Sequence, residues 1–219
     1  MLTQSMLQNA PPSTRLLRHE APARPYAFTA PHTTGLTGPS ISLRRNAEIY
    51  RENDRADHVY QVISGTVRTC RVLVDGRRQI GDFYLPGEVF GLEIGSRRTF
   101  SAEAVVGAEV TVFKRDEMSP RMWALLGREL QRTQNHLLML VKTAAERVAG
   151  FLLEIAERID LNDEIALPMS RQDIADYLGL TIETVSRTLT QLENQSAIAL
   201  PASKRIVLRN RAALRRLNS

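Results

Sequence analysis

The sequence predicts an α+β protein in which an antiparallel β-roll leads into one long helix and then into a small domain built on two short helices. Three observations predict this order. Short strand-like runs separated by turn residues fill about residues 39–115. Apolar residues recur at helical spacing after Glu117. A pair of capped helices followed by a hairpin occupies the C-terminal quarter of the chain.

The composition limits how this chain can be organised. With 219 residues, of which 43% are hydrophobic, it is long enough for one large domain or two small ones and can bury a core. We divide it into an N-terminal arm at 1–38, a β-roll at 39–120, a long helix at 121–149 and a C-terminal domain at 150–219. The arm is rich in Pro, Thr, Ala and His and is predicted to be flexible. The sequence contains no run of 18 apolar residues and no secretory signal, so we expect a cytoplasmic protein with no membrane partner.

Five strand-like runs predict the β-roll. Many short strands with regular turn signals indicate an antiparallel sandwich or barrel. Asp75-Gly76 predicts a two-residue hairpin loop between Arg71–Val74 and Arg77–Ile80. The five runs are Val59–Ile63, Thr66–Val74, Arg78–Tyr84, Ala102–Val105 and Val110–Phe113.

The long helix carries a narrow stripe of mostly apolar residues whose spacing alternates between four and three. This pattern is the a/d seam of a two-helix coiled coil over about three heptads, and it predicts a homodimer. The alternative is a helix that packs on its own β-roll, which needs a similar stripe. The seam is narrower than the usual core-facing stripe, which favours the dimer. Its members are Leu126, Leu130, Thr133, Leu137, Leu140 and Ala144.

The C-terminal domain begins with signals for two consecutive short helices. Ser170 is predicted to cap the helix Arg171–Leu178, with Asp173 completing a Ser-x-x-Asp capping box. Gly179 suits the turn that follows, because glycine takes positive φ without steric cost. Thr181 is predicted to cap the second helix. The sequence therefore predicts a helix-turn-helix.

The second helix, at about 182–194, exposes Glu183, Ser186 and Arg187 on one face near its N-terminus. A helix in the major groove reads bases with that part of its surface. Arg suits guanine, Glu suits cytosine, and Ser can contact either. The alternative is a charged, solvated helix in an ordinary bundle. Residues 169–219 carry eight Arg and Lys against four Asp and Glu, which favours a DNA partner.

A short hairpin follows the second helix. Strand-like residues at 198–200 and 205–208 flank a polar tip that contains Ser203 and Lys204. Such a tip fits a wing that donates to DNA phosphates, which completes a winged helix-turn-helix. A plain hairpin that covers the small domain is the alternative.

Five motifs in this order resemble the CRP/FNR family of bacterial transcription regulators. The resemblance covers about residues 45–215. The Glu-x-x-Ser-Arg form looks like the FNR and FixK branch, whereas the CRP branch typically has Gly where Ser186 stands. The motifs are Tyr60–Gly65, Leu85–Gly91, Arg147–Leu153, Ser170–Ala175 and Glu183–Arg187.

The resemblance implies a cyclic-nucleotide-binding-like β-roll and a dimer that reads double-stranded palindromes of the TTGA-N6-TCAA type. It implies that Arg187 contacts the guanine, Glu183 the base that pairs with its neighbour, and Ser186 the thymine side. Ser170, Arg171 and Thr181 match phosphate contacts of the family.

Departures from the family pattern bear on the effector. Cyclic-nucleotide binders of the family place a Glu after the glycine turn and then an Arg-Ser pair, where this chain has Leu92 and Phe100-Ser101. A phosphate needs a bidentate cation or several donors, so we expect no cyclic nucleotide. A displaced site stays open, because Glu93, Arg97 and Arg98 lie close by.

Other cofactors are not expected either. A four-iron cluster needs about four thiolates, and Cys70 is the only cysteine. We find no haem-ligand position and no metal site among the scattered histidines, which are His19, His32, His58 and His136.

Cys70 leaves two interpretations open. Arg68 and Arg71 flank it, and nearby cations lower a thiol pKa and favour oxidation, so it is a candidate redox residue. The alternative, which we favour, is a buried and inert cysteine.

We find no catalytic residues, because the sequence lacks a nucleophile–base pair, a phosphate loop and a dinucleotide fingerprint. The resemblance implies an effector-independent regulator, FixK-like, that activates genes for oxygen-limited growth or nitrogen fixation. Its surface loops near 51–58 and 115–121 are candidates for contact with RNA polymerase. The rival hypotheses are a ligand- or redox-gated regulator with an unrecognised effector in the roll, and a repressor.

Overall fold

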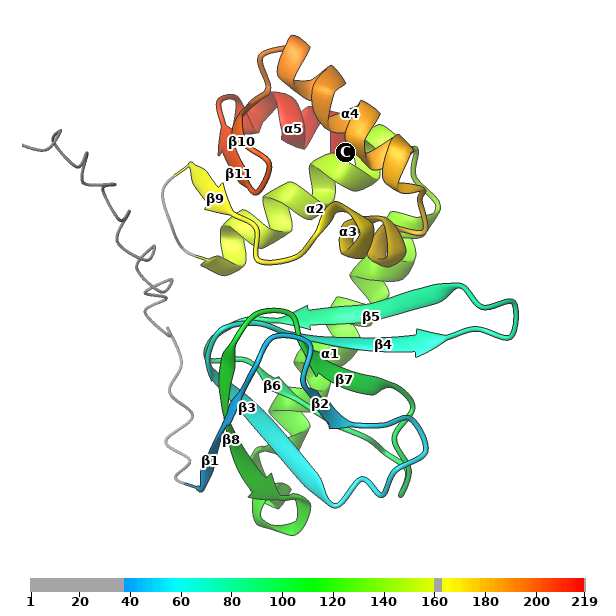
Figure 1. Ribbon diagram of the computed structural model, residues 1–219, viewed down its shortest axis with the longest axis vertical. Helices are drawn as coiled ribbons and strands as arrows, with labels where there is room; N and C mark the ends of the chain where they lie inside the picture. The colour runs from blue at the N-terminus through cyan, green and yellow to red at the C-terminus, as the bar shows by residue number, and fades with distance from the viewer. Residues whose placement is uncertain (1–37, 160–162, 219) are drawn as a thin grey trace, which may run out of the picture.

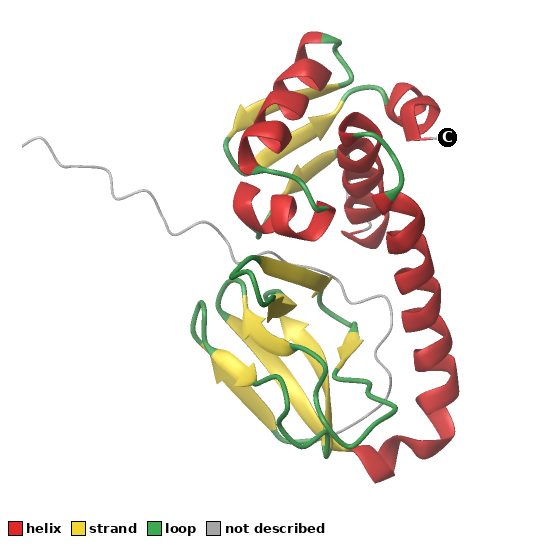
Figure 2. Ribbon diagram, turned by 90° about the vertical axis from the view of Figure 1, so that its right-hand side faces the viewer, coloured by secondary structure: helices red, strands yellow, loops and turns green. Residues whose placement is uncertain are grey.

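The computed structural model describes residues 38–159 and 163–218, so the predicted arm at 1–38 lies almost wholly outside the described residues. The β-roll occupies one end of the molecule and the C-terminal domain the other (Figure 1). A long helix runs along one side of the roll and leads into the C-terminal domain (Figure 2). The predicted α+β class and the order of its parts are confirmed.

Two four-stranded antiparallel sheets form the roll, with strand orders β1-β8-β3-β6 and β2-β7-β4-β5. The five predicted runs are present as β3, β4, β5, β7 and β8. The other three strands were not predicted, and β2 and β6 have only three and two residues, too few to show an alternating pattern. The strands are β1 (Ser40–Leu43), β2 (Glu48–Tyr50), β3 (His58–Ser64), β4 (Val67–Val72), β5 (Arg78–Tyr84), β6 (Val89–Phe90), β7 (Ser101–Ala104) and β8 (Ala108–Lys114).

The β4–β5 hairpin is present, but its predicted two-residue loop is wrong. The ladder ends at the pair Val72 and Arg78, so five residues connect the strands. The Gly76 amide donates to the Leu73 carbonyl at 2.9 Å, and Gly76 has φ +82°. Asp75 is not among the described residues with positive φ, which a two-residue type I′ loop needs at both positions. The chain therefore forms a longer turn that ends in glycine.

The segment expected to be one helix at 121–149 is two helices. A 3₁₀ turn, η1 (Arg115–Met118), leads into α1 (Ser119–Leu140), and α2 (Ala144–Ile159) follows after a break. Thr143 and Glu146 form a reciprocal cap at this break. The Thr143 amide donates to the Glu146 carboxylate at 2.7 Å, and the Glu146 amide donates to Thr143 Oγ1 at 3.4 Å. Ala144 therefore lies on α2 and does not continue the seam of α1.

The C-terminal domain packs three helices and a small sheet of order β10-β11-β9 around α2. Its core includes Phe151 and Ile155 of α2 and is continuous with Ile80 and Phe83 of β5, so the roll and the C-terminal domain share a buried apolar contact. Within the described residues no helix is long and apolar enough to cross a membrane. The elements are β9 (Glu164–Ala166), α3 (Arg171–Leu178), α4 (Ile182–Asn194), β10 (Ile198–Ala202), β11 (Arg205–Leu208) and α5 (Arg211–Asn218).

Candidate nucleic-acid interface

The first helix of the pair begins and ends as predicted. The Asp173 amide donates to Ser170 Oγ at 3.1 Å, and the Ser170 amide donates to the Asp173 carboxylate at 3.0 Å, so the capping box is complete. Gly179 ends α3 with φ +62°, in the left-handed region that glycine adopts freely. These local signals fix where α3 stops and where the chain turns.

The second helix also matches the prediction. Thr181 Oγ1 accepts a hydrogen bond from the Thr184 amide at 3.2 Å and caps α4, which ends at Asn194. Val185, Leu189 and Leu192 are buried on its inner face. This burial fixes which face of α4 points outward.

That outward face carries the three predicted base-reading residues. Glu183 and Arg187 are exposed, and Ser186 is half-buried. The pKa of Glu183 is lowered, because its own amide and the Thr181 hydroxyl donate hydrogen bonds to its carboxylate. Glu183 is therefore an ionised acceptor at neutral pH, as contact with a cytosine amino group requires.

The predicted phosphate donors lie at the helix N-termini and at the hairpin tip. Arg171 is half-buried, and Thr181, Ser203 and Lys204 are exposed. The Leu167 amide donates to the Lys204 carbonyl at 2.7 Å, so the β10–β11 tip is bound to the segment that leads into α3. In Figure 1, α4 and this hairpin lie at the end of the molecule farther from the roll.

An arginine that the sequence analysis did not single out as a site residue joins α1, α2 and α3. The Arg147 guanidinium donates to the carbonyls of Leu140 at 2.6 Å, Lys142 at 2.8 Å and Leu178 at 2.9 Å. Because these carbonyls lie at the end of α1, in the break and at the end of α3, Arg147 fixes the angles between the three helices. A positive side chain early in α2 gives no sequence signal for this role.

The predicted seam lies partly on an exposed face of α1. Leu130 and Leu137 are 60% and 59% exposed. Leu126 and Leu140 are half-buried, and Thr133 is exposed. Leu138 and Val141, which the seam did not include, are 65% and 85% exposed, so the apolar face extends beyond the predicted residues. Exposure of four large apolar side chains on and just after one helix is typical of an interaction surface.

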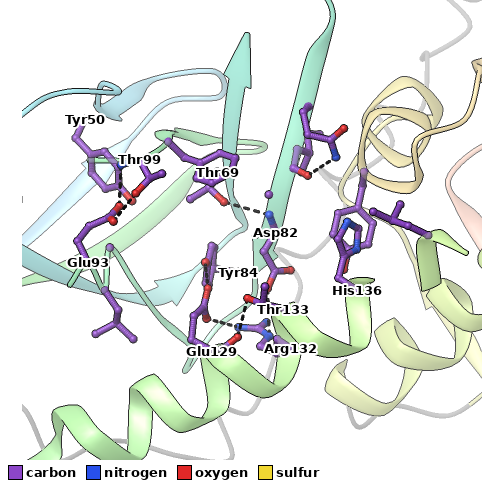
Figure 3. Close-up of a pocket in the computed structure, with 18 residues that line it drawn as sticks. Tyr50, Thr69, Asp82, Tyr84, Glu93, Thr99, Glu129, Arg132, Thr133 and His136 are labelled. Carbon is purple, nitrogen blue, oxygen red and sulfur yellow. Dashed lines mark hydrogen bonds and ion pairs between the residues drawn. The ribbon is translucent and has the colours of Figure 1, made fainter. Parts of the chain in front are cut away.

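A cavity of about 410 Å³ lies between the roll and α1 (Figure 3). Leu92 and Phe100, which stand where the resemblance places the phosphate-binding residues of cyclic-nucleotide binders, both line it. Among the described lining residues, the carboxylates of Asp82, Glu93 and Glu129 outnumber the single guanidinium of Arg132.

The charged groups of this cavity have partners within the protein. Arg132 forms ion pairs with Asp82 at 3.2 Å and with Glu88 at 3.1 Å. The Tyr84 hydroxyl donates to Glu129 at 2.7 Å. Burial raises the pKa of Glu129. A carboxyl-rich lining of this kind disfavours a phosphate group.

The sequence left open a displaced cyclic-nucleotide site near Glu93, Arg97 and Arg98. These three residues also have partners within the protein. Arg98 is 2% exposed, donates to the Gly91 carbonyl at 2.7 Å and lies 4.1 Å from the centre of the Tyr50 ring. Arg97 donates to a backbone carbonyl at 2.9 Å, and Glu93 accepts from the Thr99 hydroxyl at 2.6 Å. The burial of Arg98 was not predicted, because its sequence neighbours suggest a surface loop.

Cys70 is buried, as the favoured interpretation of a buried cysteine predicted. Burial and the neighbouring Glu103 carboxylate raise the pKa of its thiol to about 11, which outweighs the opposite effect of Arg68. Arg71 pairs instead with Glu52 at 2.9 Å. A buried thiol with a raised pKa is a poor nucleophile, which weighs against a redox role. No three His, Cys, Asp or Glu side chains of the described ranges are placed to hold a metal ion.

Comparison with known proteins gives a consistent result for both halves of the chain. The model of the cyclic nucleotide-binding domain matches residues 40–121, and the model of the Crp-like helix-turn-helix domain matches residues 146–217. The nitrogen fixation regulation protein FixK of Azorhizobium caulinodans is 52% identical over 198 residues, covering 83% of this chain and 80% of that protein.

For two further relatives, the match covers nearly the whole length of the relative. FixK of Rhizobium meliloti is 44% identical over 205 residues, covering 90% of this chain and 97% of that protein. The solved structure of FixK2 from Bradyrhizobium japonicum has a TM-score of 0.81 and 46% identity, covering 84% of this chain and 98% of that one.

Proposed function

This chain belongs to the FixK-like group of the CRP/FNR family of DNA-binding transcription regulators, and we propose that it activates transcription as a homodimer on TTGA-N6-TCAA-type palindromes without a small-molecule effector. The outward face of α4 carries this proposal. An ionised Glu183 and an exposed Arg187 stand one helical turn apart, and both belong to a helix whose start is fixed by Thr181. Arginine donates to guanine O6 and N7, and a carboxylate accepts from cytosine N4.

The phosphate contacts that we propose surround this face. Ser170, Arg171 and Thr181 lie at or beside the N-termini of α3 and α4, where amide groups and helix dipoles favour anions. Ser203 and Lys204 lie at the tip of the hairpin, which is bound by its backbone to the segment before α3. These contacts position the protein on DNA without reading its sequence.

The homodimer is supported by the exposed apolar face of α1. A palindrome is read by two recognition helices in successive major grooves, about 34 Å apart, which calls for a two-fold symmetric dimer. We propose that Leu130 and Leu137, flanked by Leu126, Thr133 and Leu140, pack against the same residues of a second copy. Contact with RNA polymerase through the loop at 51–58 and the segment at 115–121 stays a prediction from the resemblance.

Effector independence is supported by the internal pairing of the cavity. Its cation, Arg132, already binds Asp82 and Glu88, and the carboxyl groups around it disfavour a phosphate. We propose that the protein is controlled by the amount made, in oxygen-limited growth or nitrogen fixation; its FixK relatives are nitrogen fixation regulation proteins.

One observation favours the alternative of a ligand-gated regulator. The 410 Å³ cavity is lined by His136, whose Nδ1 is buried and has no hydrogen-bond partner among the described residues. A ligand that forms a hydrogen bond with His136 Nδ1 would supply the missing partner.

Fluorescence anisotropy tests the proposal. The purified protein is titrated into a labelled TTGA-N6-TCAA duplex and a scrambled duplex of equal length, in air, without added ligand and at fixed salt near physiological strength. We expect the specific duplex to bind at least about a thousandfold more tightly. Equal binding of both duplexes contradicts the proposed recognition. Specific binding only after addition of a cell extract filtrate, or after removal of oxygen, supports a gated regulator instead.

A further inference from the structure

Buried ion pairs join the roll directly to the first helix of the helix-turn-helix. Arg68 of β4 donates to the Asp173 carboxylate at 2.9 Å, and Arg78 of β5 donates to the same carboxylate at 2.6 Å. Arg78 also pairs with Asp176 at 2.7 Å. The side chains of Asp173, Arg68 and Asp176 are only 6%, 9% and 12% exposed, and that of Arg78 is 29% exposed. Water and salt therefore screen the pair of Arg68 with Asp173 weakly and the pairs of Arg78 somewhat more.

Asp173 also completes the capping box of α3, whose N-cap is Ser170. Its second oxygen accepts from the Ser170 amide at 3.0 Å and from the Ser170 hydroxyl at 2.8 Å. Burial alone would raise the pKa of Asp173. The hydrogen bonds from Ser170 and the two arginines outweigh this effect and lower the pKa, so the carboxylate stays ionised. The same side chain therefore holds the start of α3 and anchors α3 to the roll.

The far end of α3 is fixed as well. Arg147 binds the Leu178 carbonyl there and the Leu140 carbonyl at the end of α1. The sheet strand β5 packs along α3, and α3 in turn packs against α4. The orientation of α4 relative to α1 thus depends on contacts at both ends of α3.

These contacts leave the reading surface free. The ion pairs join α3 to the β4–β5 hairpin, whereas α4 follows α3 after the turn at Gly179 and extends away from the roll (Figure 1). Glu183 and Arg187 of α4 are exposed and take no part in these pairs. Docking of α3 on the roll is therefore compatible with DNA binding by α4.

We propose that Arg68 and Arg78 of the β-roll are positioning residues for DNA binding, which hold α3 through Asp173 and Asp176 so that the two recognition helices of a dimer are aligned for a palindrome. This inference rests on the proposed reading of DNA by α4. A regulator without an effector needs its recognition helices aligned in the free protein, and these ion pairs supply that alignment from the protein itself.

The expected effect follows from the dimer. The apparent affinity for the specific duplex is the intrinsic affinity multiplied by the fraction of dimers in which both protomers are aligned. If the loss of the ion pairs leaves about one third of protomers aligned, specific binding weakens about tenfold. Binding to a scrambled duplex depends on charge and changes much less.

Charge reversal tests the proposal. Arg78→Glu places a carboxylate against Asp173 and Asp176, and Asp176→Arg in the same chain restores an opposite pair. Asp176 suits this exchange because it takes no part in the capping box. The matched control is Arg77→Glu, which makes the same charge change one residue away, where Arg77 is 78% exposed and pairs with Asp75 in the hairpin turn.

We expect Arg78→Glu to lose about tenfold of its affinity for the specific duplex relative to the scrambled one, the double variant to regain most of it, and Arg77→Glu to keep the wild-type ratio. Circular dichroism and thermal unfolding establish that each variant is folded. An Arg78→Glu variant that binds with unchanged or higher specific affinity overturns the proposal, as does a double variant that binds no better than Arg78→Glu.

A distance measurement separates this inference from the proposed function. Spin labels at Arg45→Cys in the roll and Gln195→Cys after α4, diluted with unlabelled protein, report the distance between the roll and the recognition helix within one chain. The native Cys70 is buried and is left in place. We expect one narrow distance distribution in the wild type and in the double variant, and a broad or shifted one in Arg78→Glu. An unchanged distribution in Arg78→Glu overturns the positioning role, whereas failure of the wild type to prefer the specific duplex contradicts the proposed function alone.

Discussion

Arg158 is the side chain whose removal is expected to destabilise this protein most clearly. It extends from α2 to the roll, where its guanidinium pairs with Glu88 at 2.8 Å, and it also pairs with Glu154 on α2 at 2.9 Å. Asp82 lies 3.6 Å away, and the Phe83 carbonyl accepts a further bond. The side chain is 14% exposed, so the pairs are largely shielded from solvent.

Arg158→Leu keeps the apolar volume and removes the charge. Truncating one partner of a buried pair costs about 3–5 kcal/mol, because the remaining charges are left buried and unpaired. Arg132 continues to bind Glu88 and Asp82 in the variant, which offsets part of the loss. We therefore expect the free energy of unfolding at pH 7.5 to fall by about 3 kcal/mol, at the lower end of that range.

The loss is expected to depend on pH. In the wild type the pKa of Glu88 is lowered, since Arg158 and Arg132 outweigh the effect of burial, so its contribution to stability is present at neutral pH and is lost as the pH falls toward the folded-state pKa. The pKa of Glu154 is already raised by burial, and loss of Arg158 raises it further. In the variant, protonation of these buried carboxylates stabilises the folded state as the pH falls. The difference between the two proteins must therefore shrink between pH 7.5 and pH 5.

Urea unfolding followed by circular dichroism at pH 7.5, 6 and 5 measures this difference. The control is Arg51→Leu, which removes an arginine whose side chain is 73% exposed and whose pair with Glu48 is on the surface. Surface pairs contribute about 0–1 kcal/mol, so this control is expected to change little at any pH. A loss for Arg158→Leu below about 1 kcal/mol, or a loss that stays constant from pH 7.5 to pH 5, refutes the reasoning.

Four other predictions concern the interfaces and the single cysteine. Arg187→Ala is expected to lose about 1–3 kcal/mol of discrimination at one base pair, measured with duplexes substituted at single positions. Lys204→Ala is expected to weaken specific and scrambled duplexes alike and to reduce the slope of log affinity against log salt by about 1, as anisotropy at several salt concentrations reports. Leu137→Glu is expected to give monomers in light scattering; a variant that stays dimeric excludes the proposed α1 contact. The thiol of Cys70 is expected to react with iodoacetamide at pH 7.5 far more slowly in the native protein than in urea, because burial raises its pKa to about 11; equal rates contradict its burial.

The helix pair was predictable because its determinants are local. Ser170, Asp173, Gly179 and Thr181 lie close together in the sequence, and each acts on the backbone within a few residues of itself. Capping and turn preferences of this kind hold largely independently of the surrounding fold. The bounds of α3 and α4 were therefore predicted correctly before any tertiary contact was known.

The sequence contains a local signal for the break between α1 and α2, but the predicted heptad spacing continues across it. Thr143-x-x-Glu146 is a capping box, and it marks the start of α2 as clearly as Ser170-x-x-Asp173 marks that of α3. Because alternate spacing of four and three continues through the break to Ala144, periodicity alone indicated one helix. A capping signal inside a heptad pattern therefore predicts the start of a new helix better than the pattern does.

The contacts between the roll and the C-terminal domain were not predictable in the same way. Arg68 and Asp173 are 105 residues apart, and nothing near either residue indicates that they pair. The flanking cations of Cys70 suggested a reactive thiol, yet Arg68 is bound to Glu103 and Asp173. Local sequence shows which charges exist, whereas the partners of buried charges depend on how distant elements pack.

The pairing inside the cavity bears on how the protein is controlled. Ion pairs of Arg132 with Asp82 and Glu88 and a hydrogen bond from the Tyr84 hydroxyl to Glu129 join α1 to the roll. A ligand shifts a conformational equilibrium only by its differential affinity for the two states. A ligand in this cavity must therefore break or replace some of these bonds to change the position of α1. Its binding must also offset the free energy of the groups that it leaves unpaired, a requirement that is consistent with the proposed independence of a small-molecule effector.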